Sequence, residues 1–259
     1  MLSAKPAGIQ PKFVERPWGT RRLQPWFPDA PSGIGEVWFH EPESPLLVKL
    51  LFTEANLSVQ VHPDDEYAKA QGHERGKTEM WHILSAWPDA QIALGLTEAL
   101  TAEQLRESIR QKTLDSLLRW VPVKAGDTFL VEAGTIHAIG AGIVLCEIQQ
   151  NSDITYRLHD FDRGRELHIE HSVAVSDTSR QPRASGLPVT SRYFHTEEAA
   201  AGILATDCEE LLIVLSGEGS VGGRPVNGVT VWHLPANAGG VEIEFAPGAR
   251  ALRTRPIPQ

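Results

Sequence analysis

The chain has 259 residues, of which 41% are hydrophobic and 22% charged, as is usual for a soluble globular protein. A formal net charge of −9 argues against non-specific binding to nucleic acid, and no apolar run approaches the roughly 20 residues that a membrane span needs. No secretory signal pattern opens the chain, and Cys146 and Cys208 are far apart, so we expect a reduced, cytoplasmic protein without a cysteine-type zinc site.

Short strands dominate the predicted secondary structure, because 18 prolines and 22 glycines are spread along the chain and divide it into short segments. Alternation and turn residues predict ten strands, at Glu36–His40, Leu46–Phe52, Leu57–His62, Glu79–Leu84, Ile92–Leu94, Asp127–Val131, Ile143–Gln150, Glu210–Ser216, Val229–Leu234 and Val241–Phe245. The fold class is therefore predicted to be mainly β.

One segment, near 97–120, differs from the rest and predicts a small helical insertion of one or two helices. Leu105 and Ile109 have near-helical spacing there, and Thr101 with Gln104 forms a capping-box pattern. Segment 176–190 is polar and rich in turn residues, which indicates a linker. We therefore expect a first domain over 1–175 and a second, smaller β-barrel or sandwich domain over 191–259, to which we assign no chemistry.

The first candidate site residues lie on the strand that ends at His62. A side-chain period of two places Gln60 and His62 on one face, about 6–7 Å apart at their Cα atoms, which is close enough to converge on one metal ion. A histidine held only by structural hydrogen bonds is the alternative interpretation.

On the strand that follows, alternation places Lys77 and Glu79 on one face and His82 on the other. A solvated strand edge with an exposed Lys–Glu pair would give the same pattern. Periodicity does not decide whether Glu79 or His82 is the ligand.

His137 is the third candidate, in a glycine-bounded turn after a strand, where the backbone can direct an imidazole inward. Together with His62, Glu79 and the amide of Gln60 it forms a set that suits one divalent metal ion, zinc as first choice, with room for water or substrate.

Segment 143–157 contains the strongest periodic pattern. If it is extended, one face is a polar stripe of Glu147, Gln149, Asn151, Asp153, Thr155 and Arg157. Such a stripe is either a solvated outer face or the lining of a sugar-sized cavity.

At these residues the chain resembles the class I mannose-6-phosphate isomerases, also called phosphomannose isomerases, of the short bacterial type. The resemblance covers roughly residues 14–175 and rests on six ordered motifs: Arg16-Pro-Trp-Gly, Leu46-Leu-Val-Lys-Leu-Leu-Phe, Leu57-Ser-Val-Gln-Val-His-Pro-Asp-Asp, Gly76-Lys-Thr-Glu-Met-Trp, Gly134-Thr-Ile-His-Ala-Ile and Glu147-Ile-Gln-Gln-Asn-Ser-Asp-Ile-Thr-Tyr-Arg. It implies a cupin-type β-barrel (jelly roll) and an enzyme that interconverts mannose 6-phosphate and fructose 6-phosphate with one bound zinc ion (Zn2+).

Carried over by motif, the resemblance implies four metal ligands: Gln60, His62, Glu79 and His137. It thereby selects Glu79 over His82.

The same resemblance implies that Arg157 is the catalytic arginine, with Lys77 and Asp153 beside the sugar. Glu147, on the polar stripe, is a candidate substrate-binding residue. The general base stays open among zinc-bound water, Asp153, Glu147 and a neutral Lys77. The phosphate partner stays open among Arg163, Arg165 and Lys49.

The chain departs from the family pattern in two places. Its start reads Arg16-Pro-Trp-Gly-Thr where members usually carry a further glycine, and its C-terminal part is shorter and matches only weakly. A non-catalytic sugar-binding or regulatory metal cupin is therefore the alternative function, and a metal-dependent oxygenase the third. We expect a small sugar phosphate as partner, with neither nucleic acid nor membrane, and the sequence does not indicate an oligomeric state.

Overall fold

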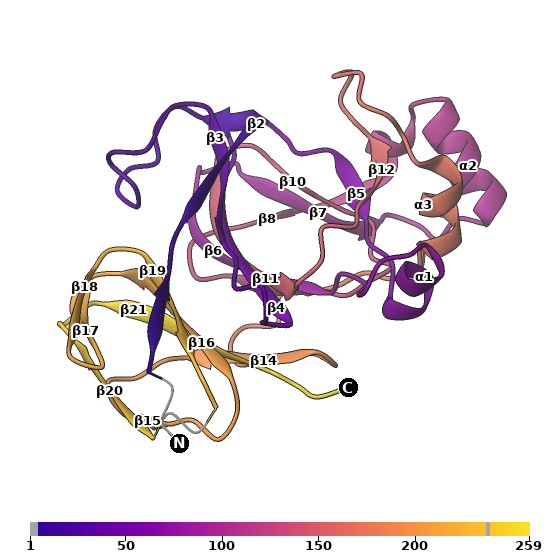
Figure 1. Cartoon of the computed structure of the whole chain (residues 1–259). Helices are drawn as coiled ribbons and strands as arrows, with labels where there is room; N and C mark the ends of the chain where they lie inside the picture. The colour runs from indigo at the N-terminus through magenta and orange to yellow at the C-terminus, as the bar shows by residue number, and fades with distance from the viewer. Residues whose placement is uncertain (1–4, 237–238) are drawn as a thin grey trace.

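The computed structural model describes residues 5–236 and 239–259, which form four antiparallel sheets and three short α-helices (Figure 1). The prediction of a mainly β protein is confirmed. All ten predicted strands are present, with ends within two residues of those expected. Among the described residues, no helix has the length and apolar character needed to cross a membrane.

Sheets 1 and 2 contain the residues singled out above. Sheet 1 has the spatial order β2 (Lys12–Thr20), β3 (Ile34–Phe39), β4 (Leu46–Phe52), β11 (Ile143–Gln150), β6 (Glu79–Ala86) and β9 (Thr128–Val131). Sheet 2 has the order β12 (Tyr156–His159), β5 (Val59–Val61), β10 (His137–Ile139), β7 (Gln91–Leu96) and β8 (Leu118–Pro122). Both sheets lie on the same side of the molecule (Figure 1).

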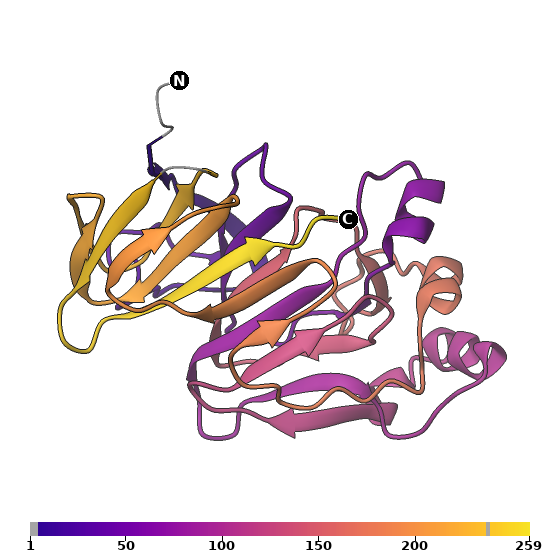
Figure 2. The ribbon, with the colours of Figure 1, turned by 90° about the horizontal axis from the view of Figure 1, so that it is seen from below.

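Sheets 3 and 4 form the other side, drawn mostly in orange and yellow (Figure 2). Sheet 3 has the order β1 (Ala7–Ile9), β19 (Thr230–Leu234), β16 (Glu210–Ser216), β21 (Arg250–Pro256), β14 (Phe194–Glu198) and β13 (Val189–Thr190). Sheet 4 has the order β15 (Gly202–Ala205), β20 (Gly240–Phe245), β17 (Glu218–Val221) and β18 (Arg224–Asn227). The first strand of the chain therefore belongs to a sheet made otherwise of C-terminal strands.

The helices gather at one edge of Sheet 2 (Figure 1) and are α1 (Asp65–Ala70), α2 (Ala102–Arg110) and α3 (Ile169–Val175), with a 3-10 turn η1 (Leu114–Leu117). Helix α2 and η1 form the expected insertion, and the capping box is present: Gln104 N donates to Thr101 Oγ1 and Thr101 N donates to Gln104 Oε1. Sequence periodicity did not indicate α1 and α3, which are only six and seven residues long.

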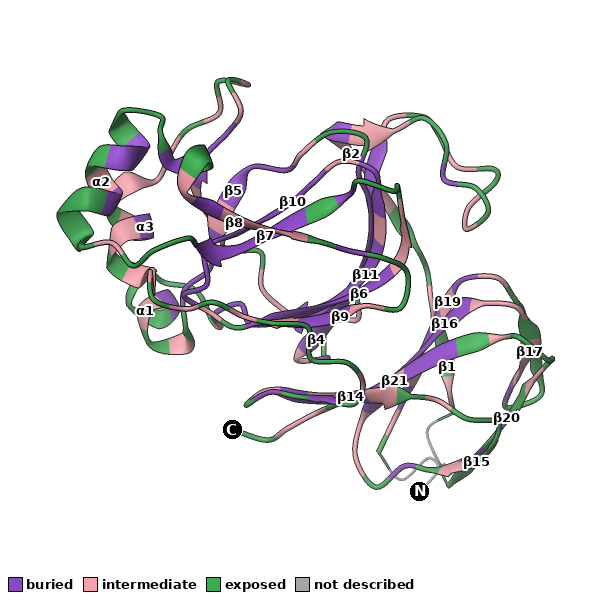
Figure 3. Ribbon diagram, turned by 180° about the vertical axis from the view of Figure 1, so that it is seen from behind, coloured by how far each residue is buried: buried purple, intermediate pink, exposed green. Residues whose placement is uncertain are grey.

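Strand β16 shows why the two sides of the molecule pack as one body. Leu211 and Ile213 belong to an apolar cluster shared with Sheet 1, whereas Leu212 and Val214 belong to a cluster shared with Sheet 4. Because successive side chains of a strand point to opposite faces, both faces of Sheet 3 are covered. Buried segments accordingly run through the centre of Sheets 1 and 3 (Figure 3). Division of the chain at 176–190 stays a prediction.

The polar stripe predicted over 143–157 is not one extended strand, because the strand stops at residue 150, although its members Glu147, Asp153, Thr155 and Arg157 all line one cavity. Strand β11 ends at Gln150, the chain turns, and β12 begins at Tyr156 in a different sheet. In the turn, Asn151 Nδ2 donates to Ser44 O at 2.8 Å and Ser152 Oγ donates to Arg75 O at 3.0 Å. These side chains are polar because they hydrogen-bond to neighbouring backbone, which alternation alone cannot distinguish from a cavity lining.

Candidate metal and substrate site

The two candidate histidines come from adjacent strands of Sheet 2, and the candidate carboxylate comes from Sheet 1. His137 opens β10 and lies opposite Gln60 of β5, and His62 directly follows β5. Glu79 opens β6. His62, Glu79 and His137 therefore lie where the ends of strands from two sheets meet.

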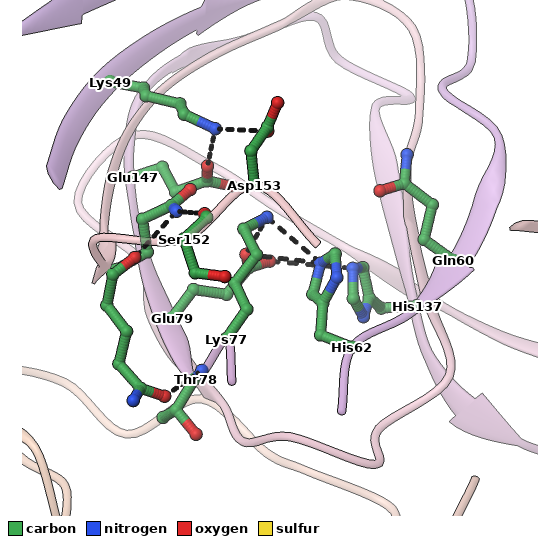
Figure 4. Close-up of polar contacts among 12 residues, drawn as sticks. Lys49, Gln60, His62, Lys77, Thr78, Glu79, His137, Glu147, Ser152 and Asp153 are labelled. Carbon is green, nitrogen blue, oxygen red and sulfur yellow. Dashed lines mark hydrogen bonds and ion pairs between the residues drawn. The ribbon is translucent and has the colours of Figure 1, made fainter. Parts of the chain in front are cut away.

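His62, Glu79 and His137 are all buried, and their ligand atoms lie within 4.8 Å of one another. Glu79 Oε2 is 3.5 Å from His62 Nε2, and Glu79 Oε1 is 3.6 Å from His137 Nε2. The imidazole rings lie side by side with centroids 4.8 Å apart (Figure 4). Two nitrogens and a carboxylate thus converge, which is a donor set suited to zinc and related divalent ions.

The backbone fixes the tautomer of both imidazoles. His62 Nδ1 is 3.0 Å from Ile154 O and His137 Nδ1 is 2.9 Å from Thr135 O. A carbonyl oxygen only accepts, so each Nδ1 carries the proton and each Nε2 presents a lone pair toward Glu79. Burial and the charge of Lys77 hold the pKa of His62 well below its usual range, and burial lowers the pKa of His137 to about 4. Both rings are therefore neutral near pH 7.

Glu79 adds a second reason to expect a cation. Its Oε2 is buried, and among the described residues it accepts no hydrogen bond of acceptable geometry, although Lys77 Nζ lies 2.7 Å away as an ion pair. Lys77 Nζ also donates to His62 Nε2 at 3.1 Å. Burial disfavours the ammonium, but Glu79 and Glu147 outweigh it and raise the pKa of Lys77, so this lysine is charged. The donor atoms fit a divalent metal ion.

Gln60 and His82, the other two residues considered as ligands, have other partners in the structure. The Gln60 amide donates to Ser58 Oγ at 3.0 Å and lies apart from the Glu79 carboxylate (Figure 4). His82 is on the opposite face of β6, where Arg250 Nη2 donates to its Nε2 at 2.9 Å. The geometry favours Glu79 over His82, and coordination by Gln60 stays a prediction.

A cavity of about 460 Å³ adjoins these residues and is lined by Lys77, Glu147, Asp153 and Arg157, all singled out from the sequence. Glu147 is buried, accepts a hydrogen bond from Trp81 Nε1 at 3.1 Å and lies 3.7 Å from Lys49 Nζ. Lys49 Nζ is also 3.7 Å from Asp153 (Figure 4). Burial and nearby Glu79 raise the pKa of Glu147.

Arg157 reaches the cavity from β12, where it lies opposite Gln60 in the register of Sheet 2. Its Nη1 donates to Glu166 O at 2.9 Å. The backbone of Arg157 is fixed on both sides by His168, since Arg157 N donates to His168 Nδ1 at 3.0 Å and His168 N donates to Arg157 O at 2.9 Å. A permanently charged guanidinium is thereby held next to the candidate metal site.

No family model matches the chain. It is 38% identical over 224 residues to mannose-6-phosphate isomerase ManA of Bacillus subtilis, covering 70% of this chain and 71% of that protein. The chain belongs to the mannose-6-phosphate isomerase family. A mannose-6-phosphate isomerase of Streptococcus mutans is 48% identical over 147 residues, covering 54% of this chain and 46% of that protein. The crystal structure of the Bacillus subtilis mannose 6-phosphate isomerase superposes with a TM-score of 0.86 at 26% identity, covering 97% of this chain and 100% of that one.

Part of the cavity wall of this mannose-6-phosphate isomerase family member was not predicted from the sequence. Arg16 and Glu36 line the cavity and form a two-bonded ion pair, with Arg16 Nε and Nη2 each 3.0 Å from Glu36, and Trp38 Nε1 donates to Glu36 at 2.6 Å. The Arg16-Pro-Trp-Gly motif was the available signal, but β2 was not predicted, so nothing placed Arg16 beside the candidate metal ligands. Of the candidate phosphate partners, Arg165 and Lys49 line the cavity. Arg163 instead donates to Asn56 O at 2.6 Å.

Proposed function

We propose that this protein interconverts mannose 6-phosphate and fructose 6-phosphate with one zinc ion per chain. His62, Glu79 and His137 would hold the ion, and Gln60 would complete the set on leaving Ser58. The observation that carries the proposal is the pair of neutral imidazoles facing a buried carboxylate oxygen that lacks a hydrogen bond, in a chain of this family. A zinc-bound mannose 6-phosphate isomerase shares the fold, with a TM-score of 0.73 at 15% identity.

An aldose–ketose exchange moves a proton between C1 and C2 through an enediol, and negative charge develops on a sugar oxygen. A bound zinc ion would supply Lewis-acid stabilisation of that charge. Arg157 would add a fixed positive charge, because a guanidinium stays protonated at any pH at which the protein folds. Arg157 Nε is buried and has no hydrogen-bond partner among the described residues, so this N–H has an unused hydrogen bond.

Proton transfer between C1 and C2 needs a group that can lose and regain a proton within the cavity. Lys77 is charged in the arrangement described, which disfavours a neutral lysine base. The Asp153 side chain is 66% exposed, whereas that of Glu147 is 5% exposed and fixed by Lys49 and Trp81. Position therefore supports Glu147 as the proton carrier and Asp153 as a group that holds Lys49 or the sugar.

The cavity charges suit a phosphate dianion once a divalent ion is bound. Its lining contains five basic residues (Arg16, Lys49, Lys77, Arg157, Arg165) and five acidic ones (Glu15, Glu36, Glu79, Glu147, Asp153). A bound divalent ion would make the sum positive, which attracts a sugar phosphate. Arg165, 30% exposed and paired with Asp160, is the best-placed phosphate partner, because Lys49 is buried between two carboxylates.

We further infer that Sheets 1 and 2 form the cupin-type barrel of a 1–175 domain, and that 191–259 forms the smaller second domain. The shared cavity between strands of the two sheets supports the first inference. The apolar cluster shared by Sheets 3 and 4 supports the second.

A coupled assay of mannose 6-phosphate conversion, run beside metal analysis, tests the proposal. Turnover should disappear on chelation and return with zinc, at one ion per chain. One bound ion without turnover on either sugar phosphate would contradict the isomerase and favour a sugar-binding metal protein.

Two substitutions on one strand provide a matched comparison. Glu79→Gln should lower both zinc content and turnover, the latter by at least about a hundredfold. His82→Gln, on the opposite face of β6, should retain zinc and turnover.

Arg157→Ala should retain zinc but lose at least about tenfold in turnover, roughly 1.4 kcal/mol. Unchanged turnover in Arg157→Ala would refute the role given to this arginine.

A further inference from the structure

A second cavity, of about 480 Å³, lies next to the one described above and contains none of its residues. We call it the Trp87–Trp120 pocket. It is formed by the turn before β7, the β8 strand and the turn after β10, which lie side by side in Sheet 2 (Figure 3). Its lining is Asn56, Trp87, Pro88, Asp89, Ala90, Gln91, Trp120, Gly140 and Ala141.

Trp87 is held in place although it is exposed. Its backbone N donates to Gly142 O at 2.8 Å, and Ala90 N donates to Trp87 O at 3.0 Å. The indole lies on the bare Cα of Gly142, because a Cβ there would be only 2.2 Å from the ring. Yet Trp87 is 58% exposed and one of only two large hydrophobic residues so exposed in the described chain. The Trp87 indole is therefore held against Gly142 while much of its surface stays exposed at the pocket.

Polar groups with spare hydrogen-bonding capacity surround the two indoles. Asn56 Oδ1 accepts a hydrogen bond from Ala141 N at 2.9 Å, which orients the amide and leaves its NH2 group available. Asp89 and Gln91 are exposed, and within the described residues their side chains have no hydrogen bond or ion pair. An oriented amide, a carboxylate and a second amide thus surround an aromatic surface.

We propose that the Trp87–Trp120 pocket binds a neutral sugar ring. A pyranose carries C–H groups on its faces, which pack against the negative face of an indole, and hydroxyls on its rim, which pair with carboxylates and amides. The volume is that of a small-molecule site. The described lining contains no Lys, Arg or His and one carboxylate, so it disfavours a sugar phosphate, in contrast to the cavity beside Glu79.

The two cavities share a wall. Asn56 lines the second and Leu57 the first, while Ile139 lines the first and Gly140 the second. Leu57 N donates to Ile139 O at 2.8 Å across that wall. An unphosphorylated sugar would therefore bind beside the candidate metal site without entering it. This binding does not depend on the proposed isomerase activity.

Indole N–H resonances of the full-length, zinc-loaded protein would report binding of methyl α-D-mannopyranoside, a neutral probe without a free anomeric carbon. Trp87→Phe and Trp120→Phe assign the two signals. The resonances of Trp87 and Trp120 should shift saturably at millimolar probe, while those of Trp18 and Trp81, which line the first cavity, should not. Shifts confined to Trp18 and Trp81, or no saturable shift, would overturn the proposal.

Variants identify the groups that bind the probe. Trp87→Ala should raise the Kd, followed on the Trp120 signal, at least about tenfold, because the stacking surface is lost. Gln91→Ala and Asp89→Ala should raise it by smaller factors and leave the fold intact. Ile203→Ala, at the other exposed large hydrophobic residue, should bind like the parent protein. Equal affinity in Trp87→Ala and the parent would refute the site, as would indole shifts that follow protein concentration rather than the probe, which indicate self-association.

Discussion

Sheets 1 and 2 and Sheets 3 and 4 are both pairs of antiparallel sheets with an apolar cluster, but the first pair also contains a charged cavity beside that cluster. Between the first pair lie buried charged and imidazole side chains, among them Lys49, Lys77, Glu79 and Glu147. Between the second pair lies an apolar cluster that includes Leu212, Val214, Trp232, Val241 and Ile243. Sheet pairing therefore does not decide function. The residues on the inward positions of each strand decide it, and they give one pair of sheets a candidate binding site beside its apolar core and the other pair a packed core alone.

The largest effect is expected from placing a charge in the apolar interior. Val214→Asp, at a fully buried position, should lower the free energy of unfolding by roughly 4 kcal/mol, because an unpaired carboxylate would lose its water. Val214→Ala, which removes volume without adding charge, should cost about 2 kcal/mol. Urea unfolding of both variants measures the difference.

Glu147→Gln tests the charged cavity between Sheets 1 and 2 in the same way. The buried carboxylate already has a raised pKa, a glutamine oxygen can still accept from Trp81 Nε1, and Lys49 keeps a second carboxylate partner, Asp153, at 3.7 Å. Its unfolding free energy should stay within about 1 kcal/mol of the parent while isomerase turnover falls. A loss of stability comparable to that of Val214→Asp would show that the two interiors do not differ as described.

Among the described residues of Sheets 3 and 4, one carboxylate is buried, that of Glu210, and an arginine neutralises it. Glu210 is fully buried and accepts from Arg253 Nη2 at 2.7 Å and from Arg253 Nε. Arg253→Leu should therefore destabilise by about 3 kcal/mol or more, since it leaves a buried charge unpaired. The double variant Glu210→Leu with Arg253→Leu should recover most of that loss in urea unfolding. Failure to recover would mean that the pair has a role beyond neutralising charge.

The two regions also meet at a titratable contact between His82 of Sheet 1 and Arg250 of Sheet 3. His82 is buried, and burial together with the charge of Arg250 lowers its pKa to about 4. The unfolded chain, with a histidine pKa near 6.5, takes up the proton first as pH falls. The contribution of neutral His82 to the free energy of unfolding should thus be fully present above about pH 6.5. It should decline by at most about 3 kcal/mol as the pH falls to about 4.

His82→Gln isolates that contribution, because glutamine can still accept from Arg250 but does not titrate. Urea unfolding of parent and variant from pH 7.5 to pH 4.5 should give curves that diverge below about pH 6.5, with the parent losing more. His62 and His137 titrate in both proteins and cancel in the difference. Parallel curves would show that protonation of His82 does not weaken the contact.

Sequence reasoning succeeded where a local pattern has one physical cause. The run Leu46–Phe52 and the run Glu210–Ser216 are strands because both faces are buried, which a continuous apolar segment indicates directly. His62, Glu79 and His137 became candidates through the family motifs, since strand alternation alone left Glu79 and His82 both open. Their convergence within 4.8 Å could not be derived from alternation, since it depends on which strand ends of Sheets 1 and 2 become neighbours.

Failures arose where a partner distant in sequence decides the structure. Asn151 looks like a member of a strand stripe, but its bond to Ser44 O, and that of the neighbouring Ser152 to Arg75 O, hold the segment in a turn. Arg16 enters the cavity because β2 pairs with β3 and Glu36 fixes its guanidinium. Helix α3 is short, and it packs against Tyr156 and Leu158 of β12 through contacts that no local periodicity records.

The smallest effect is expected from a local feature, the N-cap of helix α2. The helices of the described chain lie beside Sheet 2, so this change also distinguishes the two pairs of sheets. In α2, Thr101 Oγ1 accepts from Gln104 N at 3.3 Å and Gln104 Oε1 accepts from Thr101 N at 2.8 Å. Thr101→Ala removes the first bond and should cost about 1 kcal/mol, whereas Thr101→Ser keeps an acceptor and should cost only a few tenths. Leu105 and Ile109 bury the helix in the cluster that contains Val59 and Val61, beside His62. If Thr101→Ala lowered zinc content as well as stability, the helices would help to position the metal ligands; if it lowered stability alone, β5 would hold His62 without them.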